Sequence, residues 1–190
     1  MNRHSYALIT GASAGIGKSL AYEYARNGHN LILLARRKSL LESIAADIKQ
    51  KVPLKIDIHI LEIDLSLPNA SQIIENYCAN KNIIFNIFIN NAGVGHYRNF
   101  AEHSFSEIEQ MLQLNIQSLT YLSYFCINYW KTNSISGHLV NIASVAAYVP
   151  LDKFVVYAAS KAYVKNFSQA LRLEMSPINI RVSCVCPGGT

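Results

Sequence analysis

The sequence predicts an α/β protein built on a doubly wound parallel sheet of the Rossmann type. Segments with strand-like and helix-like hydrophobic patterns alternate along the chain, as expected when each strand is followed by a crossover helix. Segments such as Leu31-Ile32-Leu33-Leu34 are apolar throughout, which is typical of strands covered by helices on both faces. A glycine-bearing turn joins the first strand to the first helix, as in other doubly wound folds.

The elements follow in order from the hydrophobic pattern. A short apolar strand at residues 5–9 leads into a helix that runs from Ile16 to near Gly28. Further strands are predicted at residues 30–35, 56–63, 83–89, 138–143 and 178–185, and further helices at 39–49, 69–79, 106–129 and 155–175. No linker, low-complexity tract or internal repeat divides the chain, so we expect residues 1–190 to form one domain.

Charge and cysteine content exclude several kinds of partner. The formal net charge of +5 comes from lysines and arginines that are scattered along the chain, so we expect a solvated surface and no nucleic acid partner. The cysteines at positions 78, 126, 184 and 186 form no Cys-x-x-Cys pair and lack histidines at zinc-binding spacing. We therefore expect reduced, buried cysteines and no metal.

The apolar segments are short compared with a membrane span. Near the start of the chain, the run Ala7-Leu8-Ile9 is too short for the core of a signal peptide. Nowhere do about eighteen apolar residues follow one another. We expect no membrane partner and a cytoplasmic location.

The turn Thr10-Gly11-Ala12-Ser13-Ala14-Gly15-Ile16-Gly17 lies between the first strand and the first helix. Glycines there allow a tight turn and let a pyrophosphate approach the amides of the helix N-terminus. A glycine-rich turn without a ligand is one alternative. Another is a phosphate-loop NTPase, because Gly17-Lys18-Ser19 imitates part of its signature and Asp64 could act as the metal-binding acid. That signature is broken by Ala12, which stands where its first glycine belongs.

Tyr157 and Lys161 are four residues apart in a predicted helix, and Ser144 stands a short loop upstream at the end of an apolar run. Residues at this spacing lie on the same helical face, so the lysine ammonium can favour the tyrosine phenolate. A free phenol titrates near about 10, too high for ready proton exchange at neutral pH. The pattern predicts the acid–base chemistry of a carbonyl reductase. The alternative is a half-buried ring beside a solvated charge.

Arg36 and Arg37 follow the second strand, where dinucleotide folds that bind NAD carry an acid that contacts the adenosine ribose. A guanidinium can instead hold a 2′-phosphate through two parallel hydrogen bonds. We therefore predict NADP(H) as the preferred cofactor, with NAD(H) still possible. Alternatively, the two arginines cap the sheet edge or open the next helix.

Taken together, these motifs resemble the short-chain dehydrogenase/reductase family over the whole chain. The resemblance rests on Gly11-x-x-x-Gly15-x-Gly17, Asn90-Asn91-Ala92-Gly93, Asn115, Ser144, Tyr157, Lys161 and Pro187-Gly188. Segments 33–37 and 141–147 are most similar to the branch of general bacterial carbonyl reductases. The resemblance implies an NAD(P)H-dependent oxidoreductase that interconverts a small-molecule carbonyl and an alcohol by hydride transfer.

The resemblance also implies a role for each site residue. Ser144 would hold the substrate carbonyl, Tyr157 would donate the proton, Lys161 would also bind the ribose, and Asn115 would support a water that links Lys161 to solvent. Asn115 could instead be a buried helical asparagine with a satisfied backbone bond. The implied cofactor-binding residues are Gly11, Ser13, Gly15, Ile16, Gly17, Arg36, Arg37, Asp64, Asn91, Ala92, Gly93, Tyr157, Lys161, Pro187 and Gly188.

Three further expectations concern partners and the end of the chain. In the family, the helix at 106–129 and the helix carrying Tyr157 pack across a dimer two-fold, so we expect a homo-oligomer. His96 could line the substrate pocket or be an exposed loop residue. Family members continue beyond the position of Thr190 with a last strand and a substrate lid. We therefore expect a truncated product with an exposed edge at 178–185, which leaves a nucleotide-binding protein without turnover as an alternative.

Overall fold

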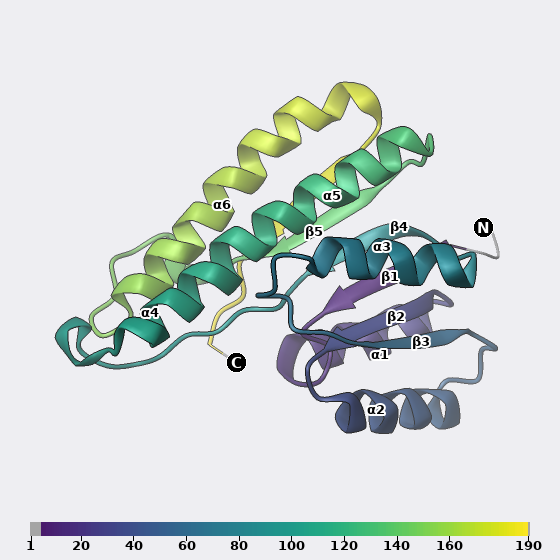
Figure 1. Cartoon of the computed structure of the whole chain (residues 1–190), viewed down its shortest axis with the longest axis horizontal. Coiled ribbons are helices and arrows are strands. Elements are labelled where there is room, and N and C mark those ends of the chain that lie inside the picture. The colour runs from purple at the N-terminus through teal and green to yellow at the C-terminus, as the bar shows by residue number, and fades with distance from the viewer. Residues whose placement is uncertain (1–4, 190) are drawn as a thin grey trace. The chain divides into compact units, whose positions relative to one another are not determined.

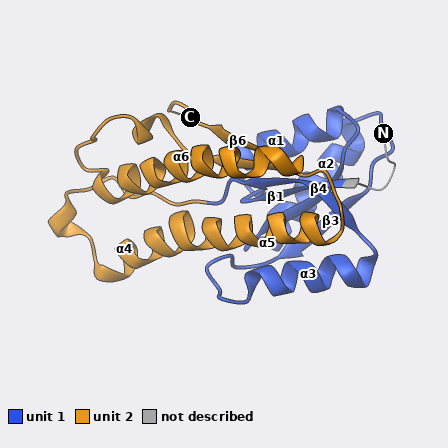
Figure 2. Ribbon diagram, turned by 90° about the horizontal axis from the view of Figure 1, so that it is seen from above, with its two compact units in different colours: residues 1–92 blue, residues 93–190 orange. Residues whose placement is uncertain are grey.

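In the computed structural model, which describes residues 5–189, strands and helices alternate from β1 to β6 as predicted (Figure 1). Thr190 lies outside the described residues. The chain divides into two compact units, unit 1 (Met1–Ala92) and unit 2 (Gly93–Thr190) (Figure 2). Each unit is an α/β assembly with parallel strands, which confirms the predicted fold class.

Unit 1 holds a four-stranded parallel sheet in the order β3-β2-β1-β4. Its elements are β1 (Ser5–Thr10), α1 (Gly15–Arg26), β2 (Asn30–Ala35), α2 (Lys38–Lys51), β3 (Ile58–Glu62), α3 (Ala70–Lys81) and β4 (Ile84–Asn90). Figure 2 shows α1 and α2 on one side of the sheet and α3 on the other. Leu8 of β1 and Leu33 of β2 are fully buried. The continuous apolar runs of the strands follow from this coverage of both faces.

Unit 2 contains the strands β5 (His138–Ile142) and β6 (Arg181–Val185), which pair in parallel. Its helices are η1 (Phe100–Glu102), α4 (Phe105–Leu112), α5 (Leu119–Thr132), η3 (Val145–Ala147), α6 (Val155–Met175) and η4 (Ser176–Ile178), with a π-helical segment, η2 (Gln113–Ser118), between α4 and α5. The long helix α6 packs against β6, η2 and η3. Unit 2 therefore places the loops after β5 and before α6 beside the first turns of α6.

Two predicted elements of unit 2 needed correction. The helix expected at 106–129 is interrupted, because residues 113–118 form the π-helical segment η2. The strand expected at 178–185 begins only at Arg181. Pro177 lies in the first turn of η4 and Asn179 adopts a left-handed φ of 59°, so the chain turns before the strand begins.

The four cysteines are free thiols, of which Cys78 and Cys126 are buried. Cys184 and Cys186 are only half-buried, so the expectation that all four lie in the core was wrong for these two. Within residues 5–189, no helix is both long enough and apolar enough to span a bilayer.

Candidate active site

The glycine turn of unit 1 packs directly against the loop after β4. Gly11 has a left-handed φ of 64°, and a Cβ atom there would come within 2.9 Å of Asn91 Nδ2. A Cβ atom on Gly17 would lie 2.4 Å from the carbonyl oxygen of Gly11. Only glycine fits at these two positions, so the turn can stay close to Asn91.

Thr10 ties the two strand ends together, although the sequence did not single it out. Its hydroxyl donates to the carbonyl of Ile89 at 3.1 Å and accepts from the amides of Asn91 and Ala92 at 2.8 and 3.0 Å. Asn91 Nδ2 donates to the carbonyl of Thr10 at 2.9 Å. These bonds thus hold the predicted residues Gly11, Asn91 and Ala92 close to one another.

The first helix of unit 1 begins without a cap. It starts at Gly15, whose φ is 50°, with no side-chain bond at Ala14 and no acidic residue in its first turn. By contrast, α4 carries a complete capping box made by Ser104 and Glu107. Ala14 and Gly15 are exposed and Ile16 is half-buried. The free amides and the helix dipole at this end suit a pyrophosphate.

Of the two predicted arginines, Arg37 contacts this turn and Arg36 lies near Asp64. Arg37 Nη2 donates to Ser13 Oγ at 3.1 Å, so the guanidinium is held beside the glycine turn. Arg37 is also the residue just before α2, as the alternative interpretation expected. Burial acts to raise the pKa of Asp64, but hydrogen bonds from Ser66 and the charge of Arg36 outweigh it and hold that pKa below its ordinary value.

The phosphate-loop alternative fits this geometry poorly. The Ser19 hydroxyl donates back to the carbonyl of Gly15 at 3.3 Å, inside the helix. Asp64 Oδ1 is bonded to the amide and hydroxyl of Ser66 at 3.0 and 2.7 Å. In the part of the chain that the structure describes, no three metal-ligating side chains lie together. A magnesium site of the NTPase kind is therefore not supported.

In unit 2, Tyr157 and Lys161 lie on one face of α6, as predicted. Lys161 Nζ is 5.7 Å from the centroid of the Tyr157 ring, and it donates to the carbonyl of Ile142 at 2.9 Å. Lys161 is buried, so the alternative of a solvated charge was wrong for this residue. Burial lowers the pKa of Lys161 to about 8, although its electrostatic interactions with Cys184 and Cys186 act to raise that pKa.

Asn115 lies in the π-helical segment and points toward the loop after Gly93. Its Oδ1 accepts from the amide of Val94 at 2.9 Å, and its Nδ2 donates to the carbonyl of Val94 at 2.8 Å and to Ser160 Oγ at 3.0 Å. Ser160 in turn donates to the carbonyl of Tyr157 at 2.7 Å. Asn115 is therefore bonded outside its own helix, and Ser160 joins it to the helix of Tyr157.

Gly93 and Gly95 let the loop at the start of unit 2 approach Asn115, Tyr157 and Lys161. A Cβ atom on Gly93 would lie 3.1 Å from Asn115 Oδ1 and 3.4 Å from Lys161 Nζ. At Gly95 it would come within 2.6 Å of Tyr157 Cδ2. The structure thus brings Gly93, Asn115, Tyr157 and Lys161 together. Gly95 and Ser160 lie in the same group. Neither was predicted as a site residue, because their partners come near them only in the folded chain.

Ser144 lies two residues after Ile142, whose carbonyl accepts from Lys161 Nζ at 2.9 Å. It precedes η3, which packs on α6, and its hydroxyl accepts from the amide of Ala146 at 3.1 Å. The carbonyl of Pro187 accepts from the amide of Val145 at 2.9 Å, so the loop after β6 runs beside the loop of Ser144. A Cβ atom on Gly188 would meet nothing within 4 Å. The Ser144 hydroxyl is half-buried and bonded only within its own loop among the described contacts.

His96 is half-buried, so the interpretation as an exposed loop residue was wrong. Its ring lies 6.4 Å from that of His103 between centroids, and its Nε2 is shielded from solvent without a hydrogen-bond partner. Its place in a substrate pocket stays a prediction.

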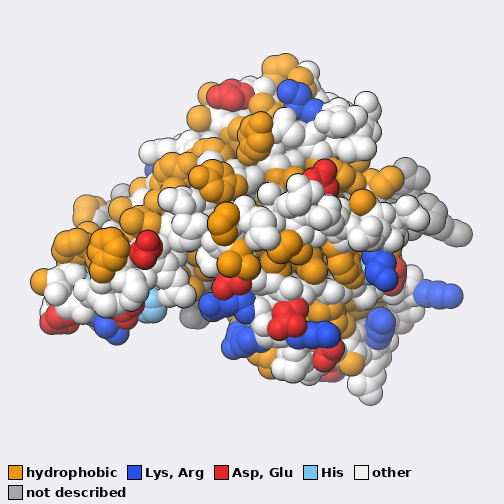
Figure 3. Space-filling model, in the orientation of Figure 1, with side chains coloured by type: hydrophobic (Ala, Val, Ile, Leu, Met, Phe, Trp, Pro, Cys, Tyr) orange, Lys and Arg blue, Asp and Glu red, His pale blue; other side chains and the backbone are white. Residues whose placement is uncertain are grey.

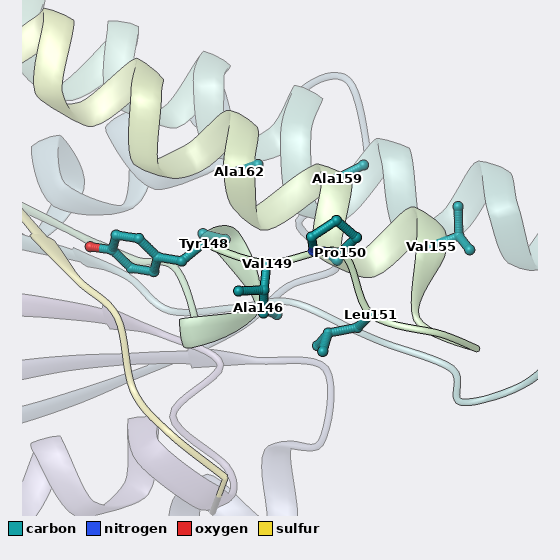
Figure 4. Close-up of a pocket in the computed structure, with 10 residues that line it drawn as sticks. Ala146, Tyr148, Val149, Pro150, Leu151, Val155, Ala159 and Ala162 are labelled. Carbon is teal, nitrogen blue, oxygen red and sulfur yellow. The ribbon is translucent and has the colours of Figure 1, made fainter.

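An apolar pocket of about 360 Å³ lies on the other side of α6 (Figure 4). It is lined by residues 146–151 and by Val155, Ala158, Ala159 and Ala162 of α6. At about 100° per residue, Val155, Ala159 and Ala162 lie on the opposite face of α6 from Tyr157, and Ala158 lies between that face and Lys161. The pocket therefore does not contain the predicted catalytic residues.

Comparison with solved structures extends the fold assignment to the whole chain. A short-chain dehydrogenase from Sphingobium yanoikuyae, solved in complex with NADPH, superposes with a TM-score of 0.88 at 35% identity, and the match covers 98% of this chain and 71% of that one. An alcohol dehydrogenase from Comamonas testosteroni that is specific for bulky-bulky ketones has a TM-score of 0.88 at 33% identity, with 98% and 74% covered. These matches confirm a Rossmann-type fold.

Sequence comparison points the same way. A very-long-chain 3-oxoacyl-CoA reductase-like protein of Arabidopsis thaliana is 35% identical over 96% of this chain, and an 11-beta-hydroxysteroid dehydrogenase-like protein of that plant is 36% identical over 95%. The chain spans 59% and 58% of the lengths of these relatives. The bacterial carbonyl-reductase branch stays a prediction. The family model for short chain dehydrogenases matches residues 5–190, and the chain therefore belongs to that family.

Proposed function

We propose that the protein is an NADP(H)-dependent oxidoreductase that interconverts a carbonyl and an alcohol. The observation that carries this proposal is the buried Lys161 ammonium, 5.7 Å from the ring of Tyr157 on the same face of α6. A cation so placed stabilises negative charge that develops on the phenol oxygen during proton transfer, so Tyr157 is positioned to act as an acid and a base.

The chain offers suitable groups for each part of the cofactor. The uncapped start of α1 and the glycines at 11, 15 and 17 would hold the pyrophosphate. Arg37, fixed by Ser13, would hold a 2′-phosphate, and Asp64 would contact the adenine. Pro187 and Gly188 would contact the nicotinamide carboxamide. When bound, the nicotinamide supplies or accepts the hydride.

The chain's own residues handle the proton and the carbonyl oxygen. Ser144 orients the oxygen, and the Tyr157 hydroxyl donates its proton as negative charge develops there. Lys161, with a pKa near 8, carries its charge at neutral pH and favours the phenolate that remains on Tyr157. Asn115, bonded to Val94 and Ser160, holds the loop of Gly93 against Lys161. Charge stabilisation that is already in place at the oxygen is the main source of rate acceleration in this scheme.

The solved relatives support the cofactor assignment. The Sphingobium structure contains NADPH, and a metagenomic oxidoreductase at 25% identity was solved with NADP. Arg36 and Arg37 favour the phosphorylated cofactor by charge. A homo-oligomer is proposed as well, because Tyr121 and Tyr124 of α5 are exposed, as residues at a subunit interface would be in the separate chain. Sedimentation of the purified protein tests that part.

A cofactor-binding protein without turnover is the second candidate. NADPH binding and oxidation, measured for the wild type and Tyr157→Phe with a panel of carbonyl compounds, separate the two. We expect both proteins to bind NADPH and only the wild type to oxidise it, because the substitution removes one hydroxyl. Unchanged turnover in Tyr157→Phe would refute the catalytic assignment. Binding by the wild type without turnover of any carbonyl would favour the second candidate.

A further inference from the structure

A row of three aromatic rings leads from Tyr157 to the protein surface. The rings of Tyr157 and Phe154 have their centroids 5.2 Å apart with planes tilted by 52°, and those of Phe154 and Tyr97 are again 5.2 Å apart with a tilt of 51°. Tyr157 and Phe154 are half-buried, whereas Tyr97 is 66% exposed. The row therefore begins at the proton donor and ends in solvent.

The backbone holds these rings in place from both sides. The amide of Arg98 donates to the carbonyl of Lys153 at 3.0 Å, which joins the loop of Tyr97 to the turn before α6. Lys153 has a left-handed φ of 59°, an unusual conformation for a lysine that lies between the ring-bearing segments. Gly95 brings the same loop against the Tyr157 ring. Two separate contacts and the left-handed turn at Lys153 thus maintain the row.

Core packing alone does not account for Tyr97. A tyrosine that served the core would bury its ring, but this ring lies mostly in water, with Lys153 Nζ 5.7 Å from its centroid. Figure 3 shows hydrophobic side chains gathered over the end of unit 2 where α4 lies. Tyr97, Phe100 and Phe105 are among the exposed apolar residues of that unit. Apolar surface next to a reacting group is typical of a substrate site.

We propose that Phe154 and Tyr97 bind the bulky apolar substituent of the substrate, and that the substrate is an aryl or other bulky ketone, or the corresponding alcohol. This inference rests on the proposed function, because a carbonyl oxygen that receives the Tyr157 proton must place its substituents beside the neighbours of that ring. Flat rings at tilted angles provide favourable contacts for an aryl group. Tyr97 and Phe154 are thus specificity residues, and neither takes part in the proton transfer.

The test compares a bulky and a small ketone. With NADPH, the rate of reduction of 1-phenylpentan-1-one and of butan-2-one is measured for the wild type, Tyr97→Ala, Tyr97→Phe and Leu54→Ala. Leu54 is an exposed apolar residue of unit 1, so its removal is the control. We expect Tyr97→Ala to lower kcat/KM for the aryl ketone about tenfold, in line with the loss of one aromatic contact and its buried area, and to change that for butan-2-one less than about twofold. Tyr97→Phe and Leu54→Ala should resemble the wild type.

Equal effects of Tyr97→Ala on both ketones, or no effect on either, would overturn the inference while the proposed function stands. If the wild type reduces neither ketone, the proposed function itself is contradicted for these substrates. Binding gives a readout that does not need turnover. Saturation-transfer NMR should show the aryl protons of 1-phenylpentan-1-one in contact with the wild type and much less with Tyr97→Ala. Absence of binding to the wild type would reject the aromatic site whatever the activity.

Discussion

The side-chain amide of Asn115 donates to the hydroxyl of Ser160 at 3.0 Å, and this bond links the π-helical segment η2 to the helix that carries Tyr157 and Lys161. Both residues are buried, and Ser160 passes the connection on through its own bond to the carbonyl of Tyr157. The position of the proposed proton donor therefore depends on a contact between segments 45 residues apart in sequence.

Ser160→Ala should lower activity more than its effect on stability explains. The substitution removes two hydrogen bonds and should reduce the free energy of unfolding by about 1–3 kcal/mol. Ser168→Ala is a matched control, because Ser168 is a buried serine of α6 that accepts from Asn141 Nδ2 at 3.0 Å and donates to the carbonyl of Val164. We expect similar losses in Tm for both variants but a several-fold lower kcat only in Ser160→Ala. Equal kcat values would mean that Ser160 is merely structural.

Gly95→Ala should displace the ring of Tyr157. The added Cβ would lie 2.6 Å from Tyr157 Cδ2, closer than two carbon atoms can approach, so the loop or the ring has to move. A small displacement of a reacting group costs on the order of a hundredfold in rate. Gly189→Ala, at a position where a Cβ would meet nothing within 4 Å, should leave kcat unchanged. Wild-type turnover by Gly95→Ala would show that Tyr157 has more room than the structure allows.

Lys161 should make the stability of the cofactor-free protein depend on pH. Its pKa is about 8 in the folded protein and 10.5 in the ordinary state, so between these values the unfolded chain binds more protons and stability rises with pH. Below about pH 8 the buried charge costs up to roughly 3 kcal/mol. Denaturant unfolding is measured for the wild type and Lys161→Met between pH 7 and 10.5. The free energy of unfolding of Lys161→Met should exceed that of the wild type by the largest amount at pH 7. A constant difference between the two proteins across this range would contradict the low pKa.

Arg37→Ala should weaken NADPH binding and leave NADH binding nearly unchanged. A charge-assisted bond to the 2′-phosphate is worth about 1.5–3 kcal/mol, which corresponds to roughly tenfold to hundredfold in Kd. Arg26→Ala is the control, since Arg26 is an exposed arginine of α1 whose described ion pair is with Glu23. Titration calorimetry with both cofactors checks the result. Equal losses for NADPH and NADH would place Arg37 outside the 2′-phosphate site.

The periodic patterns of the sequence predicted most of the elements. Spacing along one helix was also sufficient for Tyr157 and Lys161, because residues four apart always share a face. Spacing could not predict the π-helical segment around Asn115, since the apolar pattern continues through it without a break. Nor could it predict Ser160 or Gly95. Their importance depends on Asn115 and Tyr157, partners that come near them only after folding.

The π-helical segment between α4 and α5 also makes the chain sensitive to length at this point. A π turn holds one residue more than the α-helical turn it replaces, so deleting a single residue from 113–118 would let an uninterrupted α-helix form. The rotation per residue would then turn Asn115 away from Val94 and Ser160, or swing all of α5 about its axis by the same angle. Substitutions in this segment can be absorbed locally, but a one-codon deletion would rotate α5 relative to α4.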